Sequence, residues 1–159
     1  MSYPAAKYLG ESGEASAQLR PASTTPELRR RTSSVSYLAT GAKTGGQFGL
    51  YQWDFGNEGG GPGPHFHRTM TESFYILAGT VRVYDGTCWV DATCGDYLYV
   101  PEGGIHGFEG VAGTNAEMLI LFTPGAPREA YFEGLAAGLD GKTPDQRAAF
   151  FAEHDNYWV

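Results

Sequence analysis

The chain has 159 residues, within the usual size of one domain, and 23 of them are glycine, about twice the average proportion. With 42% hydrophobic and 18% charged residues it can bury a sizeable core, which excludes a wholly disordered chain. Eleven basic and 18 acidic residues give a net charge of −7, so we expect no nucleic-acid partner. No apolar run approaches the roughly 20 residues that span a bilayer, and the first residues lack the apolar stretch of a secretory signal. We therefore expect a soluble, cytoplasmic protein with no membrane partner.

The first 33 residues are rich in Ser, Ala, Pro and Thr and have no sustained apolar period. This composition predicts an N-terminal arm over residues 1–33 that is extended or mobile. Five basic and three acidic residues make residues 1–31 mildly basic, whereas six basic and fifteen acidic residues give residues 32–159 a net charge of −9. The run Arg29-Arg30-Arg31 is interpreted as a solvated turn or a dimer contact.

Residues 34–124 consist of short stretches rich in Val, Tyr, Phe, Leu and Ile, separated by turns that contain glycine. Such a pattern predicts an antiparallel β domain. The pair Asp85-Gly86 is the clearest hairpin signal, because glycine accepts the positive φ of a two-residue turn. The predicted strands are Val35–Ala39, Gln47–Phe55, His65–His67, Glu72–Ala78, Thr80–Tyr84, Cys88–Ala92, Asp96–Val100, Gly107–Glu109 and Ala116–Phe122.

Residues 125–159 change to helical spacing. Apolar residues recur at three to four positions after Arg128, and Thr143-Pro144 is typical of an N-cap followed by proline at the first helical position. We expect two short helices on the outside of the sheet, with the apolar end Tyr157-Trp158-Val159 docked on the barrel or on a partner subunit. Cys88 and Cys94 are expected to be unpaired core residues.

Three histidines and one glutamate form the pattern most suggestive of chemistry. His65 and His67 are two positions apart on a predicted strand, so their side chains share a face; Glu72 begins the next strand, and His106 returns after two further hairpins. Three imidazoles and a carboxylate suit a divalent first-row metal with positions open for water or substrate. A lone His-x-His pair, however, binds no metal in most proteins.

The spacing around these residues is more specific. Gly59-x5-His65-x-His67-x4-Glu72-x6-Gly79 and Gly95-x5-Pro101-x-Gly103-x2-His106 closely resemble the two signature motifs of the cupin superfamily. The resemblance covers residues 35–124 and implies a β-barrel of the jelly-roll or double-stranded β-helix type. It also implies that His65, His67, Glu72 and His106 hold one divalent transition metal ion, with Fe, Mn, Ni, Co and Zn not distinguished. Gly110 departs from the pattern, since the second motif usually ends there in asparagine.

Eight apolar side chains are candidates for a substrate pocket, although each is more often a core residue. Alternation from the proposed ligands places some of them beside the metal; for the last strand the sequence leaves open which face lines the cavity. As a group they favour an apolar or aromatic substrate. Arg68 and Arg82 are the nearest basic candidates, and the lack of a basic cluster argues against a phosphate or a multiply charged acid. The eight candidates are Tyr51, Trp53, Phe74, Ile76, Phe108, Met118, Ile120 and Phe122.

A looser resemblance favours one activity. The segment 121–133, with Pro124, Gly125, Tyr131 and Phe132, is similar to the segment that follows the barrel in cupins like quercetin 2,4-dioxygenase. The leading hypothesis is therefore a quercetinase-like dioxygenase in which the metal binds a substrate enolate or phenolate and Glu72 serves as the base. The alternatives are a metal-dependent, zinc-type polyketide cyclase or isomerase and a non-catalytic cupin that binds a small molecule. The open β edge, the arm and the cupin resemblance together predict a homodimer.

Overall fold

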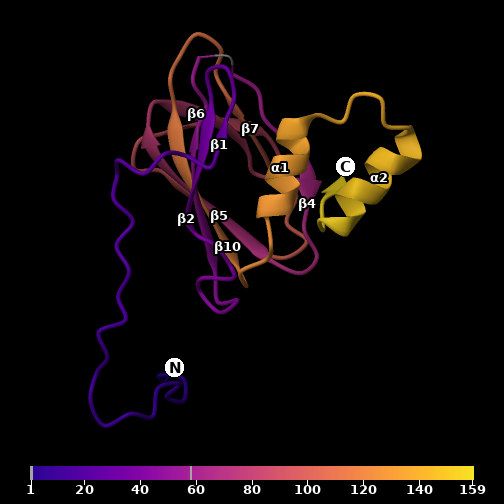
Figure 1. Ribbon diagram of the computed structural model, residues 1–159. Coiled ribbons are helices and arrows are strands. Elements are labelled where there is room, and N and C mark those ends of the chain that lie inside the picture. The colour runs from indigo at the N-terminus through magenta and orange to yellow at the C-terminus, as the bar shows by residue number, and fades with distance from the viewer. Residues whose placement is uncertain (1, 58) are drawn as a thin grey trace.

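A computed structural model describes residues 2–57 and 59–159 (Figure 1). All nine strands and both helices expected from the sequence are present, each strand within two residues of its predicted bounds, together with two short strands at positions 28–29 and 157–158. The elements are β1 (Leu28–Arg29), β2 (Ser34–Ala39), β3 (Gly49–Asp54), β4 (His65–Phe66), β5 (Thr71–Ala78), β6 (Thr80–Tyr84), β7 (Trp89–Thr93), β8 (Tyr97–Val100), β9 (Gly107–Gly110), β10 (Glu117–Thr123), α1 (Glu129–Ala137), α2 (Pro144–Glu153) and β11 (Tyr157–Trp158).

The strands form an all-β jelly roll. The largest sheet has six antiparallel strands in the order β1-β2-β3-β10-β5-β8, and it faces a three-stranded sheet, β7-β6-β9, and the pair β11-β4. The inner face of β10 is made by Met118, Ile120 and Phe122, which are buried, whereas the alternate residues of that strand are half-buried. The burial of these three residues therefore decides which face of β10 points inward, a question that alternation alone left open.

Helix α1 packs on the inner face of the large sheet, so the expectation that both helices lie outside it is wrong for α1. The ring of Phe132 contacts those of Tyr51 and Trp53 at centroid separations of 5.2 and 5.4 Å. Helix α2 has no buried residue and contacts α1 through Phe150, which stacks on Tyr131. The helical spacing in the sequence identified the apolar faces, but it carries no information on which side of a sheet receives them.

The two ends of the chain differ in how they meet the barrel. No helix or strand occurs in residues 2–27, which run away from the barrel, but β1 then pairs with β2, so the last part of the predicted arm belongs to the sheet (Figure 1). At the other end β11 pairs with β4, with Tyr157 opposite Phe66 and Trp158 opposite His65. The tail thus docks on the strand that carries the first predicted metal ligand.

Both cysteines are exposed and unpaired, so their expected place in the core is wrong. Cys88 lies in the turn between β6 and β7, where its N–H donates to the carboxylate of Asp85 at 2.9 Å. Cys94 lies in the turn that leads to β8. In the sequence, a cysteine in a tight turn cannot be told from a small core residue here, because Cys88 and Cys94 are both flanked by strand patterns.

Gly110, which replaces the asparagine usual in the second motif, lies against the ring of Phe55. A Cβ added to it would stand 2.8 Å from the nearest ring atom. The backbone of Gly110 exchanges hydrogen bonds with Gly60 at 3.0 Å in both directions, which ties the glycine-rich loop to β9. Close packing at this position accounts for a residue without a side chain.

In the described parts of the chain, neither helix is long and apolar enough to cross a membrane.

Candidate metal centre

The fold brings the four predicted ligands together. His65 on β4 and His106 lie opposite each other in an isolated antiparallel bridge, exchanging backbone hydrogen bonds of 2.8 and 2.9 Å. His67 follows β4, and Glu72 on β5 lies between Val100 and Phe122 in the large sheet. The four side chains are buried, and one ligand atom from each lies within 4.8 Å of the others.

Each histidine ring is oriented by a backbone carbonyl. Nδ1 of His65 lies 2.8 Å from the backbone oxygen of Gly63, and Nδ1 of His106 lies 2.9 Å from the backbone oxygen of Gly104. In His67 the partner is the oxygen of Asp155, at 2.5 Å. A carbonyl can only accept, so Nδ1 carries the hydrogen and the lone pair of a neutral ring is left on Nε2. This orientation by outer hydrogen bonds is what metal-binding histidines require, and the donor set fits a divalent transition ion.

The carboxylate of Glu72 is the electrostatic centre of the cluster. Its Oε2 lies 2.8 Å from Nε2 of His106 and 3.0 Å from Nε2 of His67. Burial alone would raise the pKa of Glu72, but the charge and hydrogen bond of His106, and those of His67, hold it well below its ordinary value. Glu72 is therefore ionised at neutral pH.

Two of the histidines respond to this environment in opposite directions. Burial, aided by the charge of His106, lowers the pKa of His65 to about 4, so that ring is neutral at neutral pH. Burial also acts against the charged form of His106, but the charge and hydrogen bond of Glu72 outweigh it and raise the pKa of His106. A cation bound at this cluster would replace the protons that Nε2 of His106 and Nε2 of His67 share with the carboxylate of Glu72.

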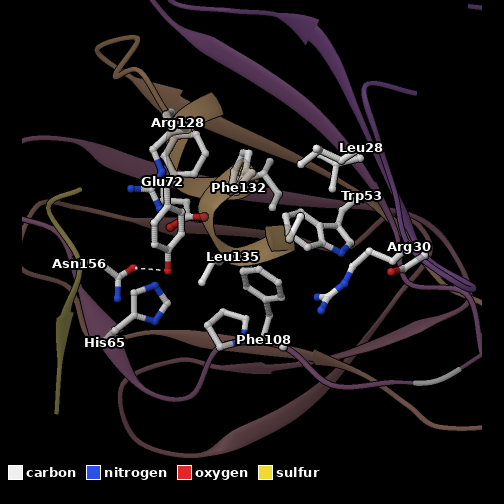
Figure 2. A pocket seen from close by; sticks show the side chains of 18 of the residues that line it. Leu28, Arg30, Trp53, His65, Glu72, Phe108, Arg128, Phe132, Leu135 and Asn156 are labelled. Atoms are coloured by element: carbon white, nitrogen blue, oxygen red, sulfur yellow. Dashed lines mark hydrogen bonds between the residues drawn. The ribbon is translucent and has the colours of Figure 1, made fainter. Parts of the chain in front are cut away.

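A cavity of about 360 Å³ opens beside the cluster, and of the four predicted ligands only His65 and Glu72 line it. Figure 2 shows these two side chains with Arg128 and Asn156 at one end, and Trp53 and Arg30 toward the other. A ligand in this cavity would approach the cluster from the side of Glu72. The apolar wall is formed by Leu28, Val35, Trp53, Gly61, Pro62, Phe108, Ile120, Phe122, Phe132, Leu135, Ala136, Phe151 and Trp158.

The eight pocket candidates divide into two groups of four. Trp53, Phe108, Ile120 and Phe122 line this cavity. The other four are buried elsewhere in the core: Tyr51, Phe74, Ile76 and Met118. The hydroxyl of Tyr51 donates to the carboxylate of Glu129 at 2.5 Å, and the ring of Phe74 packs behind His106. Alternation places these residues on the inner face, but distance along the strand decides whether they reach the cavity.

Arg128 is the main residue that the sequence reasoning missed. It is only 4% exposed, immediately precedes α1 and lines the cavity, so the expectation that Arg68 and Arg82 are the nearest basic residues is wrong. Its Nη1 donates to the carbonyl of His154 at 2.6 Å, and its guanidinium carbon lies 4.1 Å from the centroid of the Tyr131 ring. Burial lowers the pKa of Arg128, and the charge of Glu72 acts against that shift. No local signal marked Arg128, because the packing of one face of α1 against the large sheet brings it to the site.

The basic residues that the sequence favoured lie at the surface. Arg82 is paired with Glu109 and Asp91, and Arg68 is exposed, with its guanidinium over the ring of Tyr157. Asn156 and Tyr131 were also not expected at the cavity. The hydroxyl of Tyr131 donates to Oδ1 of Asn156 at 3.2 Å, and burial raises the pKa of that tyrosine to about 12.

Residues 55–122 match the family model described as a cupin domain. No curated protein matches the chain. Among solved structures, the polyketide cyclase RemF from Streptomyces resistomycificus superposes with a TM-score of 0.55 at 19% identity, covering 67% of this chain and 78% of that one. An RmlC-like cupin from Shewanella frigidimarina gives 0.54 at 22%, covering 69% and 89%. The predicted oxalate decarboxylase of Thermotoga maritima gives 0.53 at 22%, covering 58% and 80%. At these identities the likenesses establish the fold.

Proposed function

We propose, from the match of residues 55–122 to the cupin domain model and from the cupin fold, that the chain is a metal-dependent enzyme acting on an apolar or aromatic small molecule, with quercetinase-like dioxygenation as its reaction. The observation that carries the proposal is the contact between the buried cluster and the cavity: His65 and Glu72 lie at the polar end of an otherwise largely apolar chamber. The substrate class follows from the walls, since aromatic and aliphatic side chains favour a planar or apolar body.

The residues divide the work as follows. His65, His67, His106 and Glu72 would hold the ion, which when bound supplies Lewis acidity that lowers the pKa of an enol or phenol oxygen. Glu72 is ionised and lines the cavity, so its carboxylate can accept the hydroxyl proton of the substrate as a general base. Trp53 and Phe132 flank the chamber, exclude water and align a planar substrate.

A second candidate is cyclisation or isomerisation of a polyketide-like substrate, with zinc as a suitable ion. The likeness to the cyclase RemF favours it at the level of fold. The same Glu72 would then abstract a carbon-bound or hydroxyl proton while the substrate carbonyl is polarised, with no requirement for dioxygen. A third candidate, a cupin that only binds its ligand, shares the cavity but needs no base.

Oxygen dependence separates these candidates. The chain, loaded in turn with Fe(II), Mn(II), Co(II), Ni(II) or Zn(II), is incubated with quercetin while dioxygen uptake and flavonol absorbance are recorded. The proposal predicts that the dioxygen concentration and the flavonol absorbance fall together in air, and that the flavonol absorbance does not change under argon. Turnover of a polyketide-like 1,3-diketone under argon would favour the cyclase. Stoichiometric binding without product, in air and with every metal, would contradict an enzymatic role.

A further inference from the structure

Two buried nitrogen atoms beside the cavity have no acceptor. Arg128 is 4% exposed and Asn156 is 2% exposed, and both side chains line the cavity. Among the residues that the structure describes, Nε of Arg128 and Nδ2 of Asn156 have no hydrogen-bond partner. A buried donor without an acceptor is costly, and two such donors in one cavity indicate a group that completes them.

The remaining contacts of these side chains hold them in place. Nη1 of Arg128 donates to the carbonyl of His154, and the guanidinium lies over the ring of Tyr131. The hydroxyl of Tyr131 in turn donates to Oδ1 of Asn156. The guanidinium and the amide are thus held in place by contacts with one tyrosine, which limits the side-chain freedom that ligand binding would cost.

The charge at this end of the cavity favours an anion. No carboxylate in the described part of the chain lies within ion-pair distance of the Arg128 guanidinium, although Glu72 lines the same cavity. A neutral carbonyl would satisfy the amide of Asn156 but would leave the guanidinium charge without a counterion. A carboxylate meets both donors with two oxygens and one charge, whereas a doubly charged phosphate needs more cationic groups than one.

We propose that Arg128 and Asn156 form a carboxylate-binding subsite, so that the substrate is an apolar or aromatic acid rather than an uncharged molecule. Its carboxylate would lie on Arg128 and Asn156, and its apolar body would extend along Trp53 and Phe108. The identification of this acid as the substrate rests on the function proposed above. The subsite itself does not, because it is built from residues outside the metal cluster.

The test compares an acid with its uncharged isostere in the absence of metal. Binding of 2-naphthoate and 2-naphthamide to the full chain is measured by calorimetry after chelation, and again with zinc. We expect the metal-free chain to bind 2-naphthoate at least about tenfold more tightly than 2-naphthamide, since a charged hydrogen bond accounts for such a ratio. Arg128→Gln should weaken 2-naphthoate about tenfold or more and leave 2-naphthamide nearly unchanged.

Three further variants keep the outcome decisive. Asn156→Asp is almost isosteric and retains an acceptor for Tyr131, but it replaces the free donor with a negative charge, so it should also abolish the preference for the acid. Arg82→Gln, which changes an exposed ion pair, should leave binding unaltered. Arg30→Gln tests the exposed arginine at the other end of the cavity.

The subsite is overturned by any of three results: no binding of 2-naphthoate, equal binding of acid and amide in the metal-free chain, or loss through Arg30→Gln with Arg128→Gln unaffected. If binding requires zinc, the carboxylate lies on the ion and the proposal also fails. Acid binding that depends on Arg128, in a chain that turns over no substrate with any metal, would retain the subsite and contradict the enzyme.

Discussion

The backbone oxygen of Asp155 lies 2.5 Å from Nδ1 of His67, joining residues 88 positions apart in the chain. The carboxylate of Asp155 accepts hydrogen bonds from the N–H groups of Arg68 and Thr69 at 3.0 and 2.9 Å, and from the Thr69 hydroxyl at 2.7 Å. Asp155 itself has a positive φ of 54°. The C-terminal turn therefore orients a predicted metal ligand, although it lies outside both sequence motifs.

Loosening this turn should weaken metal binding without removing a ligand. Asp155→Gly keeps the positive φ at no steric cost but deletes the carboxylate that anchors the turn to Arg68 and Thr69. We expect the affinity for Zn(II), measured by competition with a chromogenic chelator, to fall about 10- to 100-fold, the usual effect of losing an outer-sphere partner. Asp155→Asn retains an acceptor, so its affinity for Zn(II) should lie between those of the wild type and Asp155→Gly. Unchanged affinity in Asp155→Gly would show that His67 is oriented without the tail.

Replacing Glu72 with glutamine should separate folding from turnover. The amide has the shape of the carboxylate but cannot accept a substrate proton, so turnover should fall by about 10² to 10⁴. Circular dichroism and the thermal midpoint serve as controls for the fold. A Glu72→Gln variant with full activity at saturating metal would contradict the role of Glu72 as base.

A divalent ion should stabilise the folded chain. A ligand that binds only the native state adds about 2.7 kcal/mol of stability at a concentration of 100 times its Kd. We expect the thermal midpoint to rise with Zn(II) or Ni(II), and a chelator to reverse the rise. His106→Gln should remove the effect, whereas His154→Gln should preserve it, because His154 lies outside the cluster. An equal metal response in both variants would place the ion elsewhere.

Much of this arrangement could be predicted from the sequence because it is local. Strand alternation and turn glycines predict β2 to β10, and the spacing of His65, His67 and Glu72 spans two strands that are consecutive in the chain. The contributions of Arg128 and Asn156 come from segments after the barrel, and their place depends on α1 packing beside the cavity and on β11 pairing with β4. Such packing is set by shape over long sequence separations, which no short pattern encodes.

The metal-free protein should be most stable near the ordinary pKa of histidine. The pKa of His106 is raised, so its contribution is complete below about pH 6.5 and is lost as the pH rises through the raised value. The pKa of His65 is lowered to about 4, so its neutral form costs stability as the pH falls from about 6.5 toward 4. Urea midpoints in the presence of a chelator, from pH 4 to 9, should therefore pass through a maximum.

Two variants test which groups cause the loss of stability on each side of that pH maximum. Glu72→Gln removes the charge that raises the pKa of His106, so the decline toward alkaline pH should flatten. His65→Gln removes the group with the lowered pKa, so the decline between pH 6.5 and 4 should diminish. If the stability profile is the same in the wild type and in both variants, neither His106 with Glu72 nor His65 controls the pH dependence of the metal-free fold.

Phe132 tests the packing of α1 on the inner face of the large sheet. Its ring is 5% exposed and contacts those of Tyr37, Tyr51, Trp53 and Phe122. Phe132→Ala should cost about 3–5 kcal/mol of unfolding free energy, the range for deleting a buried phenyl ring, and should enlarge the cavity. Phe150→Ala on α2 serves as the matched control, since that ring is only partly buried and should cost less. Equal losses in urea denaturation would indicate that α1 lies on the outside of the sheet, as its sequence pattern alone suggested.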